Sequence, residues 1–78
     1  MPKSLTDSVE NIIDFLPKGQ TFTVQSLYGK EIWELIRKNK WEGSLGKHVS
    51  KLKNVNLISG PIYDKSGKEI KGTEYERI

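Results

Sequence analysis

The sequence predicts one small α+β domain in which three helices, with a short strand after the first, precede a C-terminal β-hairpin. Three observations predict this class. Apolar residues recur at helical spacing in three separate segments, strand-forming residues gather around Phe22 and after residue 54, and a Ser-Gly turn divides the last stretch. A chain of 78 residues is long enough for one domain and too short for two. We therefore expect residues 1–78 to form a single unit.

The first helix is predicted over residues 5–16. Its apolar side chains fall on one face: Leu5, Val9, Ile12, Ile13 and Leu16. Acidic residues occupy the opposite face, and Pro17 ends the helix because proline cannot continue the hydrogen-bond ladder. Residues 20–24 follow as a short β-branched segment that favours a brief strand.

The second helix is predicted from Lys30 to about Lys38, after a turn near residues 24–28. Gly29 separates the two, and Trp33 is expected at the centre of the core. A polar turn around Asn39 then leads to a third helix that Ser44 can cap. Leu45, Val49 and Leu52 lie on one face of this third helix at i, i+4 and i+7.

The remaining residues predict a hairpin whose two strands cover residues 55–63 and 69–78. Gly60-Pro61 introduces a bend in the first strand, and residues 64–68 form the turn. The strand around Phe22 can add a third strand, because a lone hairpin is only marginally stable in water. The resulting order is α-β-α-α-β-β. A tight turn between the second and third helices followed by a hairpin is what a winged helix-turn-helix requires.

A set of short motifs also resembles a known family. They are Phe22-Thr23-Val24-Gln25-Ser26-Leu27-Tyr28-Gly29, Trp33, Leu45-Gly46-Lys47 and Tyr75-Glu76-Arg77. This pattern, spread over residues 20–78, resembles a family of small uncharacterised bacterial and phage proteins with the order Phe-Thr-x-x-x-Leu, Gly, Trp, Leu-Gly and Tyr-x-Arg. The resemblance implies a winged-helix fold and a DNA-binding role in the control of phage or mobile-element genes. It implies no catalytic residues.

The charges are distributed unevenly along the chain. Residues 1–36 carry a net charge of −2, residues 37–53 carry +5, and residues 54–78 are neutral, which together give the overall +3. A basic block beside an acidic half provides one candidate surface for an anionic partner. A solvated, lysine-rich surface with no ligand explains the same charges equally well.

The sequence therefore predicts double-stranded DNA as the partner, with the third helix as the recognition helix. Four residues of this helix are expected to enter the groove: Ser44, Lys47, His48 and Lys51. Flanking lysines are expected to contact phosphates: Lys38, Lys40 and Lys53. Lys65 and Lys68 at the hairpin turn would form a basic wing tip. The helix lacks Arg, Asn and Gln, which read bases best, so binding is expected to be mainly electrostatic.

Two other functions remain open at this point. The chain could be a protein-binding adaptor with no direct DNA contact, which docks through the acidic residues of the first two helices. It could also form a homodimer through its first helix. Trp41 is expected to cover the edge of the core rather than to contact a partner.

The composition argues against several other classes. There is no cysteine, the single histidine (His48) cannot form a metal site alone, and no nucleophile has a base partner. We therefore expect neither an enzyme nor a bound cofactor or metal. No apolar run is long enough to cross a membrane, and the start of the chain lacks the apolar stretch of a secretory signal. A cytoplasmic protein is the expectation.

Overall fold

A computed structural model describes all 78 residues and contains three α-helices and five strands. The helices are α1 (Lys3–Phe15), α2 (Lys30–Lys38) and α3 (Glu42–Ser50), with a 3₁₀ turn, η1 (Gln25–Leu27), before α2. The strands are β1 (Thr21–Thr23), β2 (Val55–Ser59), β3 (Ile62–Tyr63), β4 (Glu69–Lys71) and β5 (Glu74–Arg77). The predicted α+β class, with three helices and antiparallel strands, is confirmed.

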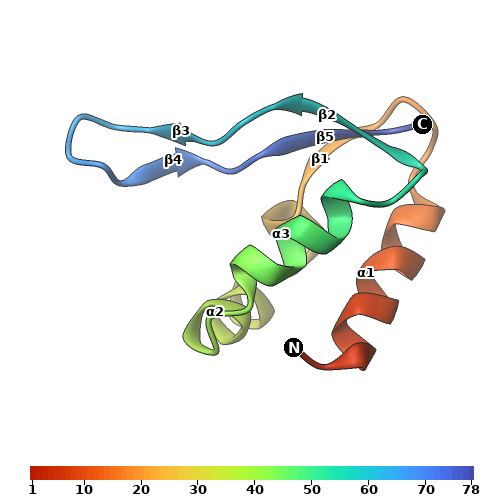
Figure 1. The fold of residues 1–78 in the computed structure, drawn as a ribbon, viewed down its shortest axis with the longest axis horizontal. Helices are drawn as coiled ribbons and strands as arrows, with labels where there is room; N and C mark the ends of the chain where they lie inside the picture. The colour runs from red at the N-terminus through yellow and green to blue at the C-terminus, as the bar shows by residue number, and fades with distance from the viewer.

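The main sheet has three antiparallel strands in the order β1-β5-β2, and the helices lie against one side of it (Figure 1). The predicted third strand is therefore present. Phe22 in β1 and Leu57 in β2 both lie opposite Tyr75 in the central strand. The rings of Phe22 and Tyr75 stack with their centroids 5.7 Å apart. This aromatic pair joins the first strand to the last one.

The core is small and draws on every layer of the fold. Its buried members are Val9, Ile13, Phe22, Val24, Ile36, Leu45, Val49 and Tyr75. The helices α1 and α3 each supply two of them at i and i+4, which is why these helices each turn one apolar face inward. Burying a side chain of this size stabilises the fold by about 1.5–3 kcal/mol.

Two details of the helices differ from the prediction. Trp33 is half-buried at the margin of the core, and Ile36 takes the central position with 2 % of its surface exposed. The apolar residues of α2 span a wider arc than the core covers, so Ile32 and Leu35 remain about half exposed. The helix α3 begins at Glu42, with Trp41 as its N-cap residue, so Ser44 lies in its first turn instead of capping it.

The turn between α2 and α3 has the hydrogen bonds of a Schellman motif. The amide of Trp41 donates to the carbonyl of Ile36 at 3.0 Å, and that of Lys40 donates to Arg37 at 2.9 Å. Lys40 has a φ of +59°, in the left-handed region where this motif favours glycine. A lysine at this position is thus conformationally unfavourable.

The end of the hairpin that includes its turn forms an arm that extends beyond the helices (Figure 1). We call residues 60–73 the hairpin arm. It contains a separate two-stranded sheet of β3 and β4. On the first side of the hairpin, the predicted bend at Gly60-Pro61 separates β2 of the main sheet from β3 of the arm. The arm has no core of its own, and Ile62, Tyr63 and Ile70 are each at least half exposed.

Candidate nucleic-acid interface

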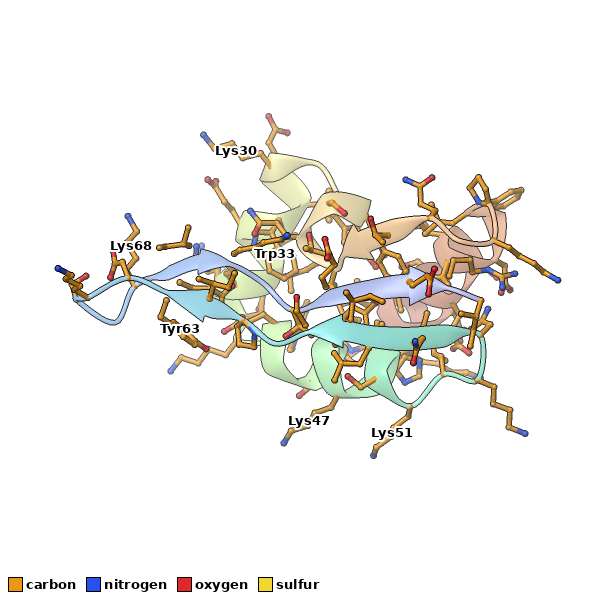
Figure 2. All side chains as sticks on the ribbon, turned by 90° about the horizontal axis from the view of Figure 1, so that it is seen from above. Lys30, Trp33, Lys47, Lys51, Tyr63 and Lys68 are labelled. Carbon is orange, nitrogen blue, oxygen red and sulfur yellow. The ribbon has the colours of Figure 1, made fainter.

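The outer face of α3 carries two exposed lysines, Lys47 and Lys51. They are one helical turn apart and lie opposite the buried Leu45 and Val49, so both project away from the rest of the molecule (Figure 2). Neither forms an ion pair. Ser44, which is also exposed, lies one turn before Lys47 on the same side of the helix. Three of the four predicted groove residues therefore share one face.

The fourth, His48, lies on the side of α3 that faces α1. Its Nε2 is 3.2 Å from a carboxylate oxygen of Glu10. The sequence predicts that His48 enters the DNA groove together with Lys47. The structure instead places the imidazole in a contact between two helices.

A second contact joins α3 to the sheet. The Tyr75 hydroxyl lies 2.8 Å from Ser50 Oγ, which itself donates to the Gly46 carbonyl at 2.9 Å. The Tyr75 hydroxyl also lies 3.4 Å from the Gly46 carbonyl, so the two hydroxyl groups and this carbonyl form one small network in which either hydroxyl can donate to the other. The orientation of α3 is thus set from two directions, by α1 through His48 and by the central strand through Ser50.

A groove of about 610 Å³ lies between α3 and the base of the hairpin arm. Lys47 and Lys51 line it from the helix, while Gly60, Pro61 and Gly72 line it from the arm. Two acidic residues, Glu42 and Glu69, also line it, so the lysines and acids of the groove balance.

The other candidate lysines occupy three separate places. Lys38 ends α2 and Lys40 lies in the turn before α3, whereas Lys53 follows the end of α3. Lys65 lies in the turn between β3 and β4. Lys68 is at the tip of the arm, well separated from Lys47 and Lys51 (Figure 2). The structure brings Lys47 and Lys51 together beside the groove and holds the arm tip apart from them.

The tip of the arm is an ordered turn built around Asp64. Its Oδ1 accepts hydrogen bonds from the Ser66 hydroxyl at 2.6 Å and from the amides of Ser66 and Lys68 at 2.9 Å. These donors, the Ser66 hydroxyl first, stabilise the carboxylate and lower the pKa of Asp64 below its ordinary value. Gly67 supplies the positive φ of +87° that the turn needs. The two tip lysines are therefore presented on a fixed backbone.

The other side of the groove consists of residues that the sequence did not predict to be functional. Gln25 of η1, Trp33 of α2 and Thr73 at the end of the hairpin arm line it. One feature of the sequence points to this groove: Gly43 and Gly46, which both line it, fall within a nine-residue helix. Glycine weakens a helix by about 1 kcal/mol relative to alanine. At both positions a Cβ atom would meet no other atom within 4 Å, so packing within the chain does not require glycine there.

No group of three or more His, Asp or Glu side chains is positioned to share a metal ion. None of the helices has the length and apolar composition needed to cross a membrane. Comparison of the chain with protein-family models, with curated proteins and with solved structures gives no match.

Proposed function

We propose that this chain binds double-stranded DNA as a winged helix-turn-helix protein and has no catalytic activity. In this proposal α2 and α3 form the helix-turn-helix, α3 enters the major groove, and the hairpin arm acts as the wing. The observation that carries the proposal is the pair Lys47 and Lys51, exposed and without ion pairs on the outer face of α3. A recognition helix needs such a face, since phosphates and base edges are rich in acceptors.

The backbone at the start of α3 supports this orientation. The first amide of the helix that finds a partner is that of Leu45, which donates to Trp41 at 2.9 Å. The amides of Glu42, Gly43 and Ser44 precede it and point out of the helix end, where they favour an anion such as a phosphate. Glycine at position 43 lets a phosphate approach this backbone closely.

Lys40 supplies a second argument. A residue that is kept in the left-handed region at a cost in stability is a candidate for a functional role. Here the side chain is a lysine just before the first turn of the proposed recognition helix. In the DNA complex it would contact a phosphate, together with Lys38 from the end of α2.

The side chains available at α3 predict weak sequence preference. Lys47, Lys51 and Ser44 can contact phosphates or base acceptors, but α3 lacks Arg, Asn and Gln, the side chains best suited to read bases. The acids Glu42 and Glu69, which line the same groove, offset part of the attraction that Lys47 and Lys51 exert on a phosphate. Binding would therefore be mainly electrostatic and depend strongly on salt.

Fluorescence anisotropy with a labelled generic duplex tests the proposal at about 50 mM and about 200 mM salt. The native chain should bind at the lower salt and lose most of its affinity at the higher one. The double variant Lys47→Glu/Lys51→Glu should not bind. The matched control Lys18→Glu/Lys30→Glu changes the net charge equally at two exposed lysines outside the proposed interface, and it should retain most of the affinity.

Equal loss of binding in both double variants would contradict a defined interface, because it would show that only the net charge matters. No binding by the folded native chain at the lower salt would refute the DNA proposal. The protein-binding adaptor would then be favoured, and substitutions of exposed acids on α1 and α2 would be the next test.

A further inference from the structure

A second concave surface lies at the other side of the helical layer, between the start of α1 and the outer side of α2. Leu5, Tyr28 and Trp41 form its partly buried floor. Ile32 and Leu35 border it with 49 % and 53 % of their surface exposed. None of these residues lines the groove beside α3. We call this surface the α2 patch.

The α2 patch is lined mainly by apolar side chains. Isolated exposed leucines are normal, but Ile32 and Leu35 are neighbours on α2 that border an apolar floor, which suits a contact with another macromolecule. Ile36 in the same helix is buried, whereas Ile32 and Leu35 are each about half exposed. The helix thus presents apolar residues on two sides, and the fold covers only one.

The charges beside the patch indicate what covers the other side. Glu31 and Lys38 are seven residues apart, so they lie on the same side of α2, next to Leu35. Both are exposed and neither forms an ion pair. The edge of the patch is therefore acidic near the start of α2 and basic near its end.

These two charges, one near each end of α2, allow two copies of the helix to pair with each other. When two copies of α2 pack antiparallel about a two-fold axis between Glu34 and Leu35, Glu31 lies level with Lys38 of the partner subunit. The same contact is made twice, as the symmetry of an isologous interface requires. A parallel arrangement would place like charges together. We propose that a second copy of this chain covers the α2 patch, with the two α2 helices antiparallel and Leu35 near the axis.

This dimer does not rest on the proposed DNA function. Lys38 is named in both proposals, but the α2 patch and the groove beside α3 share no lining residue, and the test uses no DNA. Sedimentation equilibrium of the native chain over a wide concentration range should show a monomer–dimer equilibrium. Leu35→Asp should abolish the dimer, because it buries a charge at the axis. Phe15→Asp is the matched control: Phe15 is 90 % exposed and lies outside the patch, so the dimer should persist.

The charge pattern provides the sharper test. Glu31→Lys alone and Lys38→Glu alone should each weaken the dimer by about tenfold or more, since each creates two like-charged contacts. The double swap Glu31→Lys/Lys38→Glu should restore it to within about threefold of the native value. All variants change exposed residues, and circular dichroism verifies that each remains folded.

A native chain that stays monomeric at every accessible concentration would overturn the proposal. So would a dimer that survives Leu35→Asp, because its interface would lie elsewhere. A dimer that Leu35→Asp breaks but the charge swap does not restore would overturn the antiparallel two-fold arrangement.

Discussion

Replacing Lys40 by glycine should stabilise the fold while weakening DNA binding. The φ of +59° at this position costs a non-glycine residue about 1–2 kcal/mol. Glycine removes that cost but gives the unfolded chain more freedom, which offsets about 0.4–1 kcal/mol. The expected net gain is about 1 kcal/mol in the free energy of unfolding. For a domain of this size, such a gain raises Tm by about 4–8 °C.

The same substitution removes one proposed phosphate contact. The slope of log K against log salt should become shallower by about 0.9, the value of one phosphate on duplex DNA. Lys40→Ala is the matched control, because it removes the same charge but keeps the Cβ atom that is strained at positive φ. It should lower the salt slope equally without raising Tm.

Thermal unfolding followed by circular dichroism and the salt dependence of anisotropy measure the two effects separately. If the glycine and alanine variants had the same Tm, the inference of backbone strain at Lys40 would be wrong. If both variants kept the native salt slope, Lys40 would not contact a phosphate.

Three further changes test the arm and the core. Because the pKa of Asp64 is lowered in the folded state, its carboxylate stabilises the turn at neutral pH, and this stabilisation is lost only as the pH falls through the folded pKa. NMR should therefore show the Ser66 amide signal shifting in acid while core amide signals stay unchanged, and Asp64→Asn should remove that titration. Tyr75→Phe should lower the free energy of unfolding in urea by about 1 kcal/mol. Its effect should not add to that of Ser50→Ala, because both substitutions remove the same hydrogen bond between the two hydroxyl groups, and additive losses would contradict that bond. Leu45→Ala should cost about 2–5 kcal/mol, because the side chain is fully buried, and a loss below about 1 kcal/mol would contradict its place in the core.

Helical spacing predicted much of this fold. The pair Leu45 and Val49 is buried as expected, and so is the pair Val9 and Ile13, because a period of 3.6 places such residues on one face. The same rule failed for Trp33. Apolar residues cover so wide an arc of α2 that their spacing does not decide which of them faces the core.

The site was less predictable than the fold. The shared face of Lys47 and Lys51 follows from their spacing alone, and the structure places both on the outside of α3. The contact of His48 with Glu10 joins residues 38 positions apart, and it depends on how α1 crosses α3. No local pattern encodes that crossing. The groove likewise requires the base of the hairpin arm to lie beside α3, and only the tertiary structure determines that placement.

The central position of β5 has a consequence for how this chain folds. The strand that fills the middle of the sheet is the last one in the sequence, and β1 and β2 pair only with it. During synthesis, Phe22 and Leu57 therefore lack their shared neighbour until residues 74–77 leave the ribosome. Joining such distant segments is entropically costly and slows folding. Removing residues 74–77 should consequently unfold the whole domain, because both edge strands would lose their pairing at once.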